Sequence, residues 1–155
     1  MTSIRNAALI AASIGALIFV SSGNVIAAEM ITLTQTPCQF LQPEGQDHGF
    51  KSTSKSDCIA ENKRTEKNRL KTSETLTLKP GAYTFRVTNK NVPYPLGFWL
   101  RGDGLINRAK LPSVSGGGLT TGKSRDYRII LEPGEYVYSC PLNTTPDYKL
   151  VVTEG

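Results

Sequence analysis

The segment before the third cysteine reads Leu131-Glu132-Pro133-Gly134-Glu135-Tyr136-Val137-Tyr138-Ser139-Cys140-Pro141. Polar and apolar residues alternate on both sides of the Pro-Gly pair, which is the pattern of two half-buried β-strands joined by a tight turn. The same pattern occurs earlier, where residues 75–78 and 83–87 flank a second Pro-Gly pair. We therefore expect two hairpin-like units in the second half of the chain.

Further strand-like segments lie at residues 30–35, 96–100 and 147–153. About seven short strands with turns between them predict a two-sheet β-sandwich. The exception is residues 58–70, where Asp57 is a candidate cap for a short helix. Its Lys, Arg and Glu residues are interpreted as a solvated face, since only Ile59 and Leu70 are apolar.

The first residues have the order of an export signal. Arg5 precedes an uncharged run at residues 7–20, and small residues follow at positions 27 and 28. This order predicts a signal peptide over residues 1–28 and a mature domain over residues 29–155. We expect no membrane span after cleavage, and a location in the periplasm or outside the cell.

Charge and motif content argue against nucleic acid and nucleotide as partners. The 155 residues carry a net charge of +5, a mild basic excess that is spread along the chain. Residues 117–124 match the phosphate-loop pattern G-x-x-x-x-G-K-S. That mechanism needs a strand before the loop and a helix after it, whereas a strand-like run follows here. We expect a flexible surface connection.

The chain has three cysteines, at positions 38, 58 and 140. In an oxidising compartment two of them pair and one stays free. Cys38 and Cys58 enclose a polar segment that a bridge would stabilise by about 3 kcal/mol. We predict this disulfide, with Cys140 as the free thiol. A Cys38–Cys140 bridge is the alternative, and it would remove that thiol.

His48 is the single histidine of the chain. A Cys-His enzyme would need this imidazole beside Cys140 together with an oxyanion pocket, and the sequence indicates no such pocket. We therefore expect a protein that is not an enzyme. The simplest interpretation of His48 is an exposed turn residue.

The C-terminal half resembles the cupredoxin family. The segment ending at Cys140-Pro141 is similar to the metal-loop strand of blue copper proteins, and residues 78–89 resemble the strand that leads to their first histidine ligand. The resemblance covers residues 75–155, with residues 30–38 as the first strand. It implies an all-β, cupredoxin-like Greek-key β-sandwich with a short helical insertion, at about residues 39–74, after that first strand.

The ligands of a blue copper site are missing, except for the cysteine. Such a site needs two imidazoles, a thiolate and a weak axial ligand. Tyr94-Pro95-Leu96-Gly97-Phe98 stands where the first histidine would fall, and neither His nor Met follows Cys140. A monomer is therefore expected to show no strong blue colour with Cu(II).

A second resemblance concerns the closing segment. The pattern Cys140-x-Leu142-x-Thr144-x-Pro146-x-x-Lys149-Leu150 is similar to a loop in the cupredoxin domain of periplasmic EfeO-type iron-uptake proteins, which also carry an early cysteine where Cys38 stands. Those domains use acidic residues in the segment that matches residues 96–100, and this chain has none there. The resemblance implies the fold and not the iron site.

Cupredoxin topology places the end of the first strand and the cysteine-bearing strand at one pole, so the insertion is expected beside Cys140. It would bring His48, Asp47 or Glu44 to the thiolate, or Cys38 if that residue is unbridged. Thiolate plus imidazole favours copper or zinc. We expect a periplasmic copper-handling protein with Cys140 and His48 as ligands; iron or no metal are the alternatives.

Two other functions remain open at this stage. The first is a metal-free interaction module, whose aromatic patch of Tyr94, Phe98, Trp99 and Tyr148 would meet a periplasmic protein partner. The second is electron transfer, with copper ligands contributed in part by a partner chain.

Overall fold

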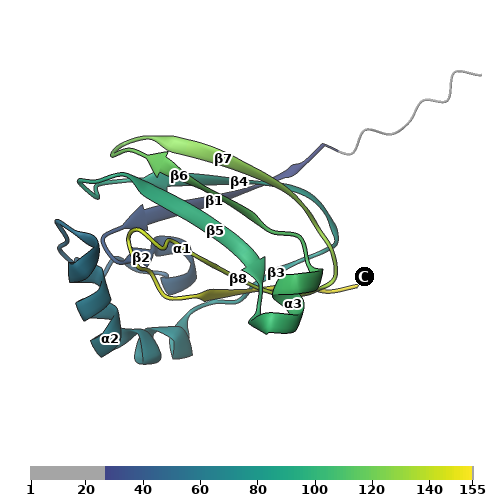
Figure 1. Ribbon diagram of the computed structural model, residues 1–155, viewed down its shortest axis with the longest axis horizontal. Helices are drawn as coiled ribbons and strands as arrows, with labels where there is room; N and C mark the ends of the chain where they lie inside the picture. The colour runs from purple at the N-terminus through teal and green to yellow at the C-terminus, as the bar shows by residue number, and fades with distance from the viewer. Residues whose placement is uncertain (1–26, 155) are drawn as a thin grey trace, which may run out of the picture.

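Two β-sheets face each other in the computed structural model, which describes residues 27–154 (Figure 1). The strand order is β2-β1-β4-β7 in one sheet and β3-β9-β8-β5-β6 in the other. Most of the predicted signal peptide, residues 1–26, lies outside the described residues. Within residues 27–154, no helix is both long enough and apolar enough to cross a membrane.

Seven of the nine strands agree with the sequence pattern, which missed β2 and β6. Their bounds are β1 (Glu29–Thr36), β2 (Gln39–Phe40), β3 (Leu76–Leu78), β4 (Gly81–Asn89), β5 (Leu96–Gly102), β6 (Val114–Leu119), β7 (Ser124–Leu131), β8 (Gly134–Ser139) and β9 (Tyr148–Val152). The helices are α1 (Leu41–Glu44), α2 (Lys55–Thr72) and α3 (Gly104–Lys110). The all-β sandwich with a small helical insertion after the first strand is thereby confirmed.

The two Pro-Gly turns connect the sheets, so the expected hairpins are wrong. β3 pairs with β9, whereas β4 pairs with β1 and β7. β7 likewise lies in the first sheet, and β8 pairs with β5 and β9 in the second. Alternation of polar and apolar residues shows that each strand has one apolar face. That face is buried equally well whether the next strand pairs with it in a hairpin or joins the facing sheet.

The core between the sheets is rich in aromatic rings. Phe98 lies 5.0 Å from Tyr127 and 5.7 Å from Phe85, measured between ring centroids. Phe98 is 1% exposed and Tyr148 is fully buried. The expected aromatic surface patch is therefore wrong, because two of its four members belong to the core.

Only the middle of residues 117–124 forms the expected surface connection, between β6 and β7. Gly117 and Gly118 belong to β6, and β7 begins at Ser124. The predicted strand after the motif is confirmed, and it leaves no helix N-terminus there to face a phosphate.

Helix α2 confirms the predicted helix and begins earlier than expected. Ser54 is its N-cap, and Asp57 acts as the third residue of a capping box. The Asp57 carboxylate accepts the backbone N–H groups of Thr53 and Ser54, at 2.8 Å and 3.0 Å. These bonds satisfy donors that the first helical turn leaves free.

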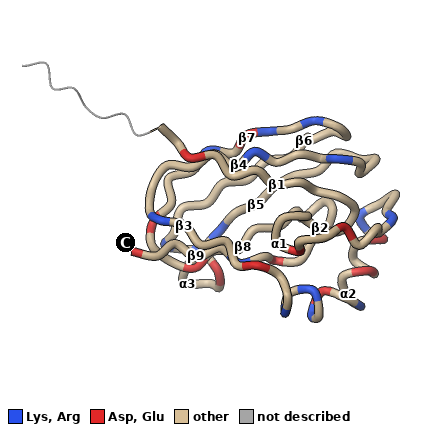
Figure 2. The backbone as a smooth tube through the Cα atoms, turned by 180° about the vertical axis from the view of Figure 1, so that it is seen from behind, with Lys and Arg blue, Asp and Glu red and all other residues tan. Residues whose placement is uncertain are grey.

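The buried stripe of α2 is polar, which is unusual for a helix packed on a domain. Cys58, Asn62 and Arg69 are buried, whereas Ile59 and Leu70 face solvent. The remaining positions carry charges of both signs along the outer face (Figure 2), as a solvated face does. Specific bonds rather than an apolar stripe therefore hold this helix to the sandwich.

Candidate functional site

Cys140 follows β8 directly and is fully buried at the pole of the sandwich where β1 also ends. Its sulfur accepts two backbone N–H groups, from Gly97 at 3.4 Å and from Asn143 at 3.2 Å. The Cys140 N–H donates to the Thr145 hydroxyl at 2.9 Å, which closes the loop behind the cysteine. The thiol is thus enclosed by the backbone of two segments.

Gly97 can reach the sulfur because β5 is irregular at this position. The register of β5 against β6 shifts between Leu96 and Phe98. A Cβ atom at position 97 would lie 2.8 Å from the carbonyl oxygen of Gly116, so only glycine fits there without displacing backbone. The Gly97 carbonyl in turn accepts the side-chain N–H of Gln35 at 2.9 Å.

Burial raises the pKa of the Cys140 thiol, although the N–H groups of Gly97, Asn143 and Leu142 lower it. Desolvation disfavours the thiolate more strongly than the bonds favour it. The thiol is therefore protonated at neutral pH and behaves as a small buried apolar group with low reactivity.

Asn143 joins the cysteine loop to the start of the insertion. Its side-chain oxygen accepts the Cys38 N–H at 3.0 Å, and its side-chain nitrogen donates to the Thr36 carbonyl at 2.8 Å. The same oxygen lies 3.3 Å from the sulfur of Cys58. The Cys38–Cys58 disulfide is present, which confirms the predicted pairing, and Cys140 is free.

His48 lies in a different environment. Its Nε2 is 2.6 Å from the Glu44 carboxylate, and its ring stacks on Phe50 with centroids 5.2 Å apart. Its backbone N–H donates to the side chain of Gln39 at 3.1 Å. None of these residues is among the groups that contact the Cys140 sulfur in the described part of the chain.

The acidic candidates are also engaged away from the thiol. Glu44 bonds to the Arg69 guanidinium at 2.5 Å and accepts a hydrogen bond from the Tyr148 hydroxyl. Asp47 accepts the backbone N–H of Gly49 in an exposed turn. The insertion does lie beside the pole, because Asn62 of α2 donates to the Thr144 carbonyl. What it brings there is the disulfide rather than a carboxylate or an imidazole.

The donor set at this pole does not fit a blue copper ion. Tyr94 stands where a blue copper protein has its first histidine ligand. The Tyr94 hydroxyl is hydrogen-bonded to the Ser52 hydroxyl at 2.6 Å. The Gln35 side-chain oxygen is buried without a partner among the described residues, and it is a hard ligand. Residues 27–154 contain no group of three or more His, Cys, Asp and Glu side chains placed to share a metal.

Comparison with known proteins identifies the fold. No protein-family model matches the chain, and no curated protein matches it. Auracyanin B is similar in structure, with a TM-score of 0.50 and 15% identity over 81% of this chain and 89% of that protein. The dithionite-reduced auracyanin of Roseiflexus castenholzii has a TM-score of 0.48 and 12% identity over 82% of this chain and 98% of that protein. The likeness to auracyanin B shows that the chain has the cupredoxin fold.

Sequence reasoning missed Gln35, Gly97 and Asn143, which organise the surroundings of the thiol. The position of Asn143 three residues after Cys140 carried a local signal, since a tight turn brings such an N–H back to the sulfur. Gln35 and Gly97 carried none, because Gln35 meets Gly97 across the sandwich and Gly97 meets Cys140 from the neighbouring strand, 43 positions away.

Proposed function

We propose that this protein is an exported, non-enzymatic cupredoxin-fold module that acts by binding another protein and does not carry blue copper. The observation that supports this most directly is the state of Cys140. The residue is fully buried and its sulfur is bonded to two backbone N–H groups, while the single histidine is paired with Glu44. A conventional His₂Cys site therefore lacks its imidazoles in a monomer.

Exposed apolar residues on α3 support the protein-binding part of the proposal. Leu105 is 85% exposed and Ile106 is 71% exposed. Nearby, Trp99 carries the guanidinium of Arg108 at 5.5 Å from its ring centroid. Large exposed apolar side chains beside an aromatic residue and arginine are typical of protein contact surfaces.

The test is metal analysis and a visible spectrum of protein isolated from the periplasm, with thiols counted before and after reduction. We expect no stoichiometric metal and no intense thiolate-to-copper band. One thiol should react after denaturation alone, and two more after reduction. Copper at one equivalent together with an intense blue band would overturn the proposal.

Cu(I) handling through Cys140 is the second candidate, and a specific observation favours it. Two N–H groups already point at the sulfur, and such bonds stabilise a thiolate, which is the soft ligand that Cu(I) prefers. On this alternative, Cys140→Ser weakens Cu(I) binding at least tenfold, or about 1.4 kcal/mol. His48→Ala changes it less, or not at all if the imidazole stays with Glu44. Equal Cu(I) binding by wild type and Cys140→Ser would eliminate this candidate.

Kinship to EfeO-type iron-uptake domains and electron transfer with ligands shared between two chains are weaker proposals. The first rests on the resemblance of the closing loop, and the second on the cupredoxin fold. The metal analysis tests the first, which requires iron in the isolated protein. The second requires copper to bind once the partner chain is added.

A further inference from the structure

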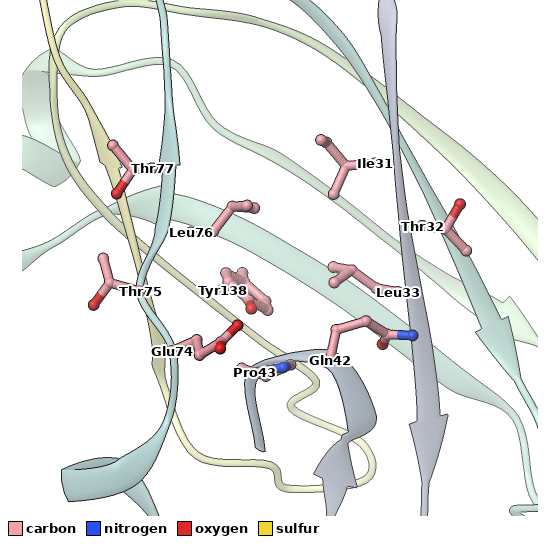
Figure 3. Close-up of a pocket in the computed structure, with 10 residues that line it drawn as sticks. All are labelled: Ile31, Thr32, Leu33, Gln42, Pro43, Glu74, Thr75, Leu76, Thr77 and Tyr138. Atoms are coloured by element: carbon pink, nitrogen blue, oxygen red, sulfur yellow. The ribbon is translucent and has the colours of Figure 1, made fainter. Parts of the chain in front are cut away.

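A groove lies along the open side of the sandwich, between the edge strand β3 and the part of β1 that the short strand β2 leaves unpaired (Figure 3). β1 forms one wall, and β3 forms the other. The cavity has a volume of about 230 Å³. Its floor is apolar and consists of Ile31, Leu33, Leu76 and the ring of Tyr138.

The β1 wall presents unpaired backbone groups. The Gln35 carbonyl accepts the N–H of Lys90, so Gln35 faces β4. The Thr34 N–H faces the opposite way, where the Gln42 side chain accepts it at 2.7 Å. Backbone direction alternates along a strand, so the N–H and C=O of Thr32 also face the groove side. No partner occupies them within residues 27–154.

The β3 wall is arranged in the same way. The Leu78 carbonyl accepts the N–H of Thr153, so Leu78 faces β9. The backbone groups of Thr77, one residue earlier, therefore point to the open side. Unpaired strand edges are templates for an added strand.

The usual spacings of packed sheets and paired strands indicate that such an opening holds one extended chain. Packed sheets lie about 10 Å apart, and paired strands lie about 4.8 Å apart. A single added strand can therefore bond to the Thr32 edge on one side and to the Thr77 edge on the other. Its side chains would alternate between the apolar floor and solvent.

Tyr138 adds one polar group to the apolar floor of the groove. The residue is 1% exposed and lines the groove, and its hydroxyl makes no hydrogen bond among the described residues, although its oxygen is not one of the fully buried atoms that lack a partner. A hydroxyl at the wall of the groove that has no partner in the chain can donate a hydrogen bond to a bound peptide. Figure 3 shows the ring between Leu76 and Leu33, at the base of the groove.

The charge of the groove selects among extended chains. The Glu74 carboxylate is directed into it (Figure 3). A second hollow continues along the same edge beyond Thr77 and is lined by Glu29 and Lys79. The Glu74 carboxylate favours a basic side chain at its end of the groove, where no cation lines the hollow, whereas Lys79 offsets Glu29 in the second hollow.

We propose that the groove between β1 and β3 binds an extended segment of a partner protein, with alternating apolar side chains and a Lys or Arg beside Glu74. Binding adds a strand that joins the two sheet edges, the mode known as β-augmentation. This inference rests on the proposed protein-binding function and places the contact with an extended partner in this groove rather than on α3.

The probe is a fluorescein-labelled hexapeptide of alternating Val and Thr with one terminal Lys, measured by fluorescence anisotropy. We expect saturable binding by the wild type and none by the same peptide with N-methylated backbone. Thr32→Pro removes the outward N–H without touching the bonds to β4, so it should weaken binding at least about tenfold. Thr32→Ala keeps that N–H and is the matched control, with unchanged affinity.

Two further variants keep the test decisive if Thr32→Pro fails to fold. Glu74→Lys should weaken binding of the Lys peptide and strengthen binding of the matching Glu peptide. Tyr138→Phe removes only the unpartnered hydroxyl, so it should weaken binding several-fold while the melting temperature is kept. Wild-type affinity in all of these variants, or no peptide binding at all, overturns the inference.

The other outcomes separate this inference from the proposed function. If peptide binding is instead lost in Leu105→Ser/Ile106→Ser, the groove assignment is wrong while the protein-binding function stands. A dimer in sedimentation that Thr32→Pro dissociates would make a second copy the occupant and overturn the partner assignment. Stoichiometric copper with no peptide binding would overturn both.

Discussion

Asn143 donates its backbone N–H to the sulfur of Cys140 at 3.2 Å. Its side chain simultaneously binds Cys38 and Thr36, so one buried amide ties the cysteine loop to the end of the first strand. The pole that holds metal in blue copper proteins is here closed by hydrogen bonds within the chain. The state of this pole therefore depends on Asn143 as much as on the cysteine.

Asn143→Ala should lower the free energy of unfolding by about 2–4 kcal/mol. The change leaves the Cys38 N–H and the Thr36 carbonyl buried without partners, and each such group costs about 1–3 kcal/mol. Urea denaturation measures the loss. Asn68→Ala, at an exposed position of α2, is the control and should change stability little. An equal effect of both substitutions would contradict the role given to Asn143.

Replacing both members of the disulfide, in Cys38→Ala/Cys58→Ala, should cost about 3 kcal/mol. Since α2 has no apolar stripe, its amides should also exchange faster than those of β4 and β8. Hydrogen exchange measured by mass spectrometry checks this. If amide exchange became faster by the same factor in α2 and in the strands, the disulfide would stabilise the whole domain rather than hold this helix to the sandwich.

Substitutions at the buried ion pair of Glu44 and Arg69 should have strongly non-additive effects on the free energy of unfolding. The two side chains are 2% and 5% exposed, and Arg69 also donates to the Cys38 carbonyl at 3.0 Å. Glu44→Gln leaves the guanidinium without its counter-charge and should cost about 3 kcal/mol or more. Glu44→Gln/Arg69→Met should cost less than the sum of the single variants, as a double-mutant cycle in urea would show. Additive losses would mean that the pair contributes no interaction of its own.

Stability should fall in alkaline solution, beginning at about pH 9. Burial raises the pKa of both the Cys140 thiol and the Tyr138 phenol. The ordinary pKa values are about 8.5 for Cys and about 10 for Tyr, so the unfolded chain loses these protons while the folded chain keeps them. Stability is thus full below the unfolded pKa values and declines above them. Thermal melts at rising pH test this, and Tyr138→Phe should reduce the slope above pH 10. An unchanged slope would count against it.

Lys123→Ala should leave stability within about 0.5 kcal/mol of the wild type and should leave ligand binding unchanged. Lys123 is exposed in the turn before β7, where a phosphate loop would require a helix. Equilibrium titration with ATP and Mg²⁺ provides the measurement. Nucleotide binding that this substitution abolishes would restore the phosphate-loop interpretation.

The sequence alone was sufficient for seven of the nine strands, the presence of a helix around residues 58–70, the Cys38–Cys58 pairing and the lack of a second histidine. These features are local: alternation over a few residues reports a half-buried strand, and the absence of a second histidine needs no coordinates. The resemblance in residues 75–155 supplied the cupredoxin fold in the same way, through short motifs.

Only the tertiary structure decided which sheet each strand joins, what His48 contacts and how Cys140 is enclosed. Alternation says that a strand has an apolar face and does not say which strand lies opposite, so the Pro-Gly turns were misread as hairpins. The bonds that define the pole connect distant residues, such as Asn143 with Thr36, which are separated by 107 positions. Such contacts have no local pattern, because each forms only when segments far apart in the sequence meet in the folded sandwich.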